Sequence, residues 1–156
     1  MTRFGHSIFC DDIRNEVGGK LSFIGCYNGV IFVPPEFPLV IPRFCIHLQI
    51  FSPAQKPYSS IVARCYAPSV DAPILEMPVE TPEQHEQQAL LAGLEKERSA
   101  PLYIVAATSL IFTPLRILST GLLRVRAMID GENEELRLGS IRVEVRPDDL
   151  TGPLPS

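Results

Sequence analysis

The chain has no tryptophan, only three histidines, and four cysteines, at positions 10, 26, 45 and 65, that form no CxxC pair. Because free cysteine is usually interior and a disulfide framework needs an oxidising compartment, we expect buried free thiols. No apolar run approaches the roughly 18 residues of a membrane span, and the first ten residues lack the apolar core of a signal peptide. We therefore expect a cytoplasmic protein.

The chain also lacks any excess of positive charge. Its 14 Lys and Arg face 18 Asp and Glu, which gives a net charge of −4 and an isoelectric point of about 5.4. Residues 71–100 concentrate the acidic excess, with seven Asp and Glu against two Lys and Arg. Proteins that bind nucleic acid generally use a basic surface for phosphate contacts, so we expect neither a nucleic acid nor a membrane as partner.

Motifs for catalysis and cofactor binding are missing as well. There is no Gly-x-Ser-x-Gly elbow, and Gly18-Gly19-Lys20 lacks the earlier glycine and the following Ser or Thr of a phosphate-binding loop. Cys45 and His47 are two apart on an expected strand, but one close pair does not make a zinc site. The sequence predicts no catalytic residue, no metal and no cofactor, and hence a protein that is not an enzyme.

Short strands dominate what is present. Fifteen prolines in a chain that is 46% hydrophobic indicate many strands separated by turns. The expected strands are 8–10, 20–27, 30–33, 44–51, 61–67, 103–112, 122–129 and 136–145. We expect Asn28-Gly29 to form a two-residue hairpin and the proline-rich segment 34–38 to cross between strands or sheets. The sequence predicts an all-β fold, a two-sheet antiparallel β-sandwich of about seven strands with one short surface helix.

Alternation assigns faces to several of these strands. Residues 44–51 alternate like a half-buried strand, whereas 103–112 are nearly all apolar, as in a strand covered on both faces. The last two strands flank Asp130-Gly131 and should form a hairpin with Arg124 and Arg126 outward. The residues expected to face the core there are Leu123, Val125, Ala127, Ile129, Ile141, Val143 and Val145.

One helix is expected, from Pro82 to about Glu97, because Thr81 can act as N-cap with proline at the first helical position and Gln84 three residues after the cap. The stretch Pro68–Pro82 carries four prolines and predicts a long, mobile loop. We expect one β-sandwich domain over residues 1–146 and a flexible tail over 147–156.

A block of charges, Asp11, Asp12, Arg14, Glu16 and Lys20, directly precedes an apolar strand and forms the candidate binding site. The two cations should keep the carboxylates ionised by ion pairing, which opposes a role as general acid. The sequence leaves three interpretations of this block open, a solvated turn with internal ion pairs, a binding surface and a catalytic site.

The stretch from Cys10 to Tyr27, of the pattern CDDIRxExxGKLSxIGxY, resembles an uncharacterised family of small bacterial proteins of unknown function. Gly121 leading an alternating strand into Asp130-Gly131 and a final strand resembles the closing hairpin of immunoglobulin-like sandwiches. This chain departs from antibody domains because it has no cysteine in Leu122–Ile129 and no tryptophan. The resemblance implies an immunoglobulin-like fold and a bacterial origin.

Three functions follow as expectations. The first is a non-catalytic protein-binding or assembly module, in which the charged block and the acidic 80–98 segment face a protein partner or a second copy of the chain. The second is a small-ligand-binding protein or enzyme whose pocket is lined by Asp12, Arg14, Glu16 and Lys20. The third is a structural subunit of a phage-like assembly.

Overall fold

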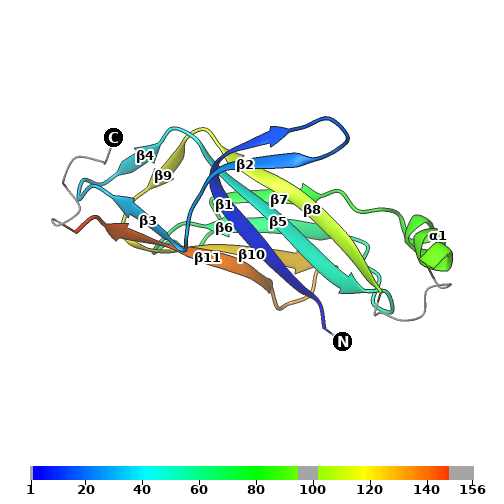
Figure 1. Ribbon diagram of the computed structural model, residues 1–156. Coiled ribbons are helices and arrows are strands. Elements are labelled where there is room, and N and C mark those ends of the chain that lie inside the picture. Colours follow the sequence, from blue (N-terminus) through cyan, green and yellow to red (C-terminus); the bar gives the residue numbers. More distant parts are fainter. Residues whose placement is uncertain (1, 95–101, 148–156) are drawn as a thin grey trace.

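The computed structural model describes residues 2–94 and 102–147, which fold into two main β-sheets packed against each other, a small third sheet and one helix (Figure 1). The first sheet has the order β2 (Leu21–Cys26), β1 (Phe4–Asn15), β5 (Phe44–Pro53) and β8 (Tyr103–Phe112), all antiparallel. The second has the order β3 (Val30–Val33), β11 (Leu136–Val145), β10 (Gly121–Ile129), β6 (Ile61–Tyr66) and β7 (Leu75–Val79). The all-β sandwich predicted from the sequence is confirmed.

The remaining elements lie outside these two sheets. The strands β4 (Leu39–Ile41) and β9 (Leu115–Ile117) pair into a small sheet, and α1 (Gln84–Leu94) follows β7. The described residues thus contain eleven strands, more than the seven or so that were expected. The predicted tail 147–156 and the end of the predicted helix lie largely outside the described residues.

The core between the two main sheets follows the alternation of the sequence. Fully buried side chains from the two sheets meet there; among them are Phe44, Ile46, Leu48, Ile50, Leu110, Leu123, Val125, Ala127, Ile141 and Val143. The predicted hairpin of β10 and β11 is confirmed, and six of the seven residues assigned to its inner face are buried. Val145 is the exception, at 39% exposed, because it lies at the end of β11.

Asn28-Gly29 does not close a hairpin, contrary to the prediction. Strand β2 belongs to the first sheet and β3 to the second, so these two residues carry the chain from one sheet to the other. Gly29 has a φ of 78°, and its carbonyl accepts a hydrogen bond of 3.0 Å from the Arg142 amide. Strand β3 then pairs with β11 in parallel, a pairing that the local turn signal could not predict.

The proline-rich stretch Pro68–Pro82 is not a continuous loop, because it contains β7 at the edge of the second sheet. Proline has no amide hydrogen to donate to a neighbouring strand. An edge strand tolerates Pro78 because it pairs with a neighbour on one side only, whereas an inner strand pairs on both sides. The helix begins later than predicted: the Glu86 side chain accepts a hydrogen bond of 3.0 Å from the Glu83 amide, which makes Glu83 the N-cap. Thr81 donates instead to the carbonyl of Ser59.

Two predictions of strand burial are wrong in opposite directions. Strand β5, expected to be half buried, is buried on both faces from Phe44 to Leu48. Strand β8, expected to be covered on both faces, exposes Val105 and Ile111 by 46% and 48%. The reason is position: β5 is an inner strand with an additional cover over part of its outer face, whereas β8 is the edge of its sheet.

Candidate interaction surface

Strand β1 changes partner halfway along its length. Its first half pairs with β5 up to Cys10, opposite Cys45, and its second half pairs with β2 from Cys10, opposite Cys26. The hairpin of residues 11–26, called the arm here, therefore leaves the body of the sheet and projects along the upper side of the molecule (Figure 1). The sequence predicted the strand of residues 20–27 but not its pairing with a long β1.

The base of the arm is held by Asp11. Its Oδ1 accepts a hydrogen bond of 2.6 Å from the Tyr27 hydroxyl. Gly25 has a φ of 67°, and a Cβ at this position would collide with the Asp11 carboxylate, so a glycine is required there. Burial, together with the neighbouring Asp11, raises the pKa of Tyr27 far above its ordinary value. Asp11 is therefore an internal tie of the arm.

Asp12 also contacts the protein itself. Its Oδ1 lies 2.9 Å from Nε of Arg43 and accepts a hydrogen bond of 2.9 Å from the Ile13 amide. The hydrogen bond from Arg43 lowers the pKa of Asp12, and the Arg14 charge adds a smaller effect. The carboxylate is thus kept ionised as predicted, but the main cation comes from outside the charged block.

The other three residues of the charged block lie along the free part of the arm. Arg14, Glu16 and Lys20 are exposed, and their side chains form no hydrogen bond or ion pair with the described residues. The backbone amide of Glu16 donates to the Lys20 carbonyl at 2.8 Å and closes the turn. Val17, at the tip, is 93% exposed. The charged block is therefore divided into two parts. Asp11 and Asp12 are bound to the protein at the base of the arm, whereas the other three charges lie toward the tip with the exposed Val17.

The arm covers part of the outer face of the first sheet. The Phe23 ring lies 5.2 Å from the His47 ring, centroid to centroid, and His47 is only 7% exposed. His47 Nδ1 lies 3.0 Å from the Ser109 hydroxyl. Burial, with a smaller effect from His6, lowers the pKa of His47. This cover explains why the outer face of β5 is buried there.

Farther along the same face lies an aromatic cluster of Phe4, His6, Phe51 and Tyr103. The Phe4 and Phe51 rings stack with centroids 4.8 Å apart, and Tyr103 meets Phe4 edge to face at 5.5 Å. His6 stacks on Phe51 at 5.9 Å. Phe4 remains 48% exposed and the neighbouring Val105 46% exposed. The cluster is therefore an apolar surface that the described residues leave open to solvent.

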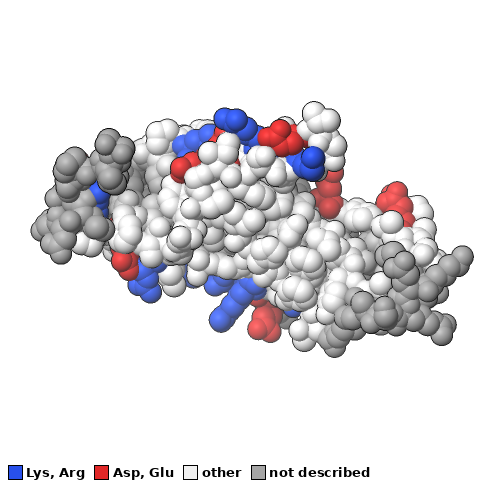
Figure 2. All heavy atoms as spheres, viewed as in Figure 1, with Lys and Arg blue, Asp and Glu red and all other residues white. Residues whose placement is uncertain are grey.

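Charged side chains lie above and below this face in the view of Figure 2 but are absent from its centre. Figure 2 shows a broad area without Lys, Arg, Asp or Glu over the middle of the view, with charges gathered along the arm above it and along the lower side. The register explains the gap, because the outward positions of β5 and β8 hold no charged residue. Those positions are Cys45, His47, Gln49, Phe51 and Pro53 on β5, and Tyr103, Val105, Ala107, Ser109 and Ile111 on β8.

A cavity lies elsewhere, at the end of the sandwich where the chain begins. It has a volume of about 610 Å³, and its lining includes Arg3, Lys56, Glu132 and Arg137. None of the charged block that was expected to form a pocket lines it. This cavity therefore gives no support to the second hypothesis, a pocket lined by Asp12, Arg14, Glu16 and Lys20.

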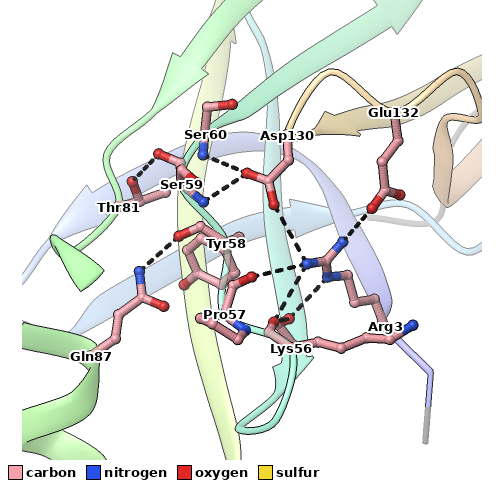
Figure 3. Close-up of polar contacts among 11 residues, drawn as sticks. Arg3, Lys56, Pro57, Tyr58, Ser59, Ser60, Thr81, Gln87, Asp130 and Glu132 are labelled. Atoms are coloured by element: carbon pink, nitrogen blue, oxygen red, sulfur yellow. Dashed lines mark hydrogen bonds and ion pairs between the residues drawn. The ribbon is translucent and has the colours of Figure 1, made fainter. Parts of the chain in front are cut away.

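Arg3 joins three segments at this end, as Figure 3 shows. Its guanidinium donates to the Ser52 hydroxyl at 3.0 Å and to the Glu132 carboxylate at 2.9 Å, and it lies 3.6 Å from an Asp130 oxygen. It also donates to the carbonyls of two residues in the loop after β5, at 3.4 and 3.2 Å. Since its donors are engaged within the protein, Arg3 is a structural residue. No sequence pattern marked it.

Asp130 and Gln87 extend the same set of contacts (Figure 3). Asp130 Oδ1 accepts hydrogen bonds from the amides of Ser59 and Ser60, at 2.7 and 2.9 Å. Gln87 is fully buried, and its side-chain nitrogen donates to the Tyr58 carbonyl at 2.9 Å. The helix α1 is thereby attached to the loop between β5 and β6. A buried glutamine in this helix could not be predicted from the sequence, because the neighbouring residues of the helix are mostly polar.

The outer face of the second sheet holds a cluster of ion pairs centred on Arg64. Arg64 lies 2.8 Å from Glu76 and 2.7 Å from Glu135, and the Tyr66 hydroxyl donates to Glu135 at 2.6 Å. Burial alone would raise the pKa of Glu135, but the hydrogen bonds from Tyr66 and Arg64 outweigh it and lower that pKa. Arg124 lies over the Tyr66 ring, 5.1 Å from its centroid. These contacts hold β6, β7 and the start of β11 together.

Three cysteines are buried and free as predicted, whereas Cys26 is exposed at the base of the arm. Within residues 2–94 and 102–147, no group of three or more His, Cys, Asp and Glu side chains is arranged to hold a metal ion. The described part of the chain also has no helix with the length and apolar character needed to span a membrane.

Comparisons of the chain with protein-family models, curated proteins and solved structures return no match.

Proposed function

We propose that this protein is a non-catalytic binding module that docks a protein partner through the arm and the aromatic cluster. The observation that carries the proposal is the tip of the arm, where Val17 is 93% exposed between Glu16 and Lys20 on a hairpin that projects from the body of the sheet. An apolar side chain on a projecting hairpin adds nothing to the core, and contact with a partner would give it a role.

The composition of the surface supports a protein as the partner. Protein interfaces combine an apolar, aromatic-rich centre that is poor in charge with a polar rim. The aromatic cluster lies within the uncharged face, and the charged arm lies along the border of that face. Neither nucleic acid nor a membrane is proposed as partner, because the centre of the face holds no Lys or Arg side chain and the arm sets three carboxylates against Arg14 and Lys20.

The strand order supports the immunoglobulin-like part of the proposal. In immunoglobulin domains one sheet contains the order A-B-E and the other G-F-C-C′. The orders β1-β5-β8 and β11-β10-β6-β7 correspond to these if β1 is strand A. We propose this classification together with membership in the small bacterial family that residues 10–27 resemble and a cytoplasmic location.

Two other functions are weaker proposals on these observations. A ligand-binding protein or enzyme that uses the charged block Asp11–Lys20 would need a pocket at the arm, and the cavity at Arg3 is lined by none of these residues. A subunit of a phage-like assembly would use the same docking surface toward second copies of the chain. Sedimentation of the purified protein distinguishes that case, because it would then form large oligomers.

The test is capture of partners from a lysate of the source cell, with identification by mass spectrometry. Wild-type protein is compared with Arg14→Glu/Lys20→Glu on the arm and with Val105→Glu beside the aromatic cluster. A partner retained by wild type and lost from both variants is the expected result, because each variant places negative charge on one half of the proposed surface.

Matched controls separate this effect from a general change of charge or hydrophobicity. Arg116→Glu/Arg146→Glu makes the same charge change at two exposed positions away from the arm, and Leu118→Glu replaces an apolar side chain that is 55% exposed. Both controls should retain the partner. Equal retention of every captured protein by the arm variant, the Val105 variant and wild type would refute the proposed surface.

A further inference from the structure

We infer that Cys10 and Cys26 form a reversible disulfide at the base of the arm when the protein meets a peroxide. The inference is independent of the proposed binding function, since it rests on the pairing of β1 with β2 and β5. Cys10 is the direct cross-strand neighbour of Cys26 on one side and of Cys45 on the other. Directly opposed residues of an antiparallel pair point to the same face, so these three thiols form a row.

The hydrogen-bond pattern sets the spacing within this row. The Tyr27 amide donates to the Phe9 carbonyl at 2.9 Å, which makes Cys10 and Cys26 a non-hydrogen-bonded pair. The Cα atoms of such pairs lie about 4.5 Å apart and their side chains approach closely. Disulfides accept Cα separations of roughly 4.4–6.8 Å, so the backbone already has the spacing that the bond requires.

Exposure determines which thiol reacts first. Cys26 is exposed, whereas Cys10 and Cys45 are fully buried. Burial, reinforced by Cys45, Cys26 and Asp11, raises the pKa of Cys10 to about 11, so Cys10 is a poor first nucleophile. The Cys45 thiol points to the Asp11 carbonyl, with 3.7 Å between sulfur and oxygen. Cys26 is thus the thiol that a peroxide can reach, and Cys10 is the neighbour that resolves it.

The reaction has two steps. Cys26 Sγ attacks one oxygen of hydrogen peroxide, the O–O bond breaks, and the leaving hydroxide takes up the thiol proton to become water, which leaves a sulfenic acid. Cys10 Sγ then attacks Cys26 Sγ, the S–O bond breaks, and a second water leaves with the Cys10 proton. The two thiols supply the two electrons that reduce the peroxide, and an external dithiol returns both cysteines to thiols by exchange.

The experiment treats the folded protein with hydrogen peroxide, blocks the remaining thiols and maps tryptic peptides without reduction. The sequence suits this test, because cleavage after Arg3, Arg14, Lys20, Arg43 and Arg64 places the four cysteines on four peptides. The expected product links the peptides of Cys10 and Cys26 and disappears on treatment with a dithiol. A link between Cys10 and Cys45, a Cys26 dimer of two chains, or Cys26 oxidised without a link would each overturn the inference.

Two variants and a melting experiment complete the test. Cys26→Ser should give no linked peptide, whereas Cys65→Ser, which removes a buried thiol in the other sheet, should form the same link as wild type. The closed loop from Cys10 to Cys26 should raise the melting temperature of oxidised wild type by about 6–12 °C over the reduced form. The Cys26→Ser protein should melt at one temperature with and without peroxide, and a peroxide-dependent rise in this variant would contradict the assignment.

Discussion

Replacement of Arg3 by alanine should destabilise the whole domain, although the residue is the third in the chain. The Arg3 side chain is 12% exposed and connects the start of β1 to the loop after β5 and to the turn between β10 and β11 (Figure 3). Arg3→Ala removes these contacts together and leaves the Ser52 hydroxyl, which donates to the Lys56 carbonyl, without its donor.

The magnitude follows from which contacts are shielded from water. The hydrogen bond to Ser52, at 3.0 Å, is part buried, and hydrogen bonds to charged groups contribute about 1.5–3 kcal/mol. The two carbonyl contacts, at 3.4 and 3.2 Å, are long and add less. Glu132 is 58% exposed, so its ion pair contributes about 0–1 kcal/mol. Asp130 keeps its two amide donors, Ser59 and Ser60. We expect a loss of about 2–3 kcal/mol in the free energy of unfolding.

Urea denaturation followed by circular dichroism measures this loss, and the melting temperature should fall by about 5–10 °C. Glu132→Gln is the matched control, because it removes only the exposed ion pair and should cost less than about 1 kcal/mol. If Arg3→Ala and Glu132→Gln change the free energy of unfolding equally, the buried contacts of Arg3 contribute nothing and the reasoning fails.

Two further predictions test the core and the cover over β5. Leu123→Asp or Val143→Asp should unfold the domain, since each places an unpaired charge at a fully buried position, whereas Leu122→Asp, at a position that is 42% exposed, should keep the circular dichroism of wild type. A folded Leu123→Asp protein would show that the inner face of β10 is assigned wrongly. Burial lowers the pKa of His47 from 6.5, so the unfolded chain binds a proton at this histidine more tightly than the folded protein does. The free energy of unfolding should therefore fall as the pH drops through about 6.5, and it should level off below the pKa of His47 in the folded state. His47→Gln should remove this part of the pH dependence. The control His85→Gln replaces a histidine whose side chain is 75% exposed and should retain it. The same pH dependence in wild type and His47→Gln would refute the assignment.

The alternation of apolar and polar residues predicted the fold well for strands that have one face in the core and one face in solvent. The hairpin of β10 and β11 was predicted with its turn, its strands and nearly all of its inner residues, because alternation and the Asp130-Gly131 signal act over a few neighbouring residues. Alternation failed where burial depends on a distant segment. Strand β5 is covered by Phe23 of the arm, whereas β8 exposes Val105 and Ile111 because it is the edge strand of its sheet among the described residues.

The candidate site shows the same division between local and distant information. The charged block could be read from composition, but its split into a tied base and a free tip depends on Tyr27 and Arg43, which lie 16 and 31 residues from their partners. The aromatic cluster brings together β1, β5 and β8, and no sequence window contains all of its rings. The structural role of Arg3 could not be predicted from the sequence, because its partners are loop carbonyls and isolated side chains that form no sequence motif.

The sequence by itself therefore determined the all-β class, the inner face of the last hairpin and the presence of a charged segment before β2. These properties depend on backbone preference and hydrophobic alternation, which act over a few residues. Only the tertiary structure decided that β1 serves two partners, that the arm leaves the sheet, and that Cys10 lies between Cys26 and Cys45. Strand pairing brings together residues that are far apart in the chain, and the free energy that selects one pairing comes from the core that the sheets share.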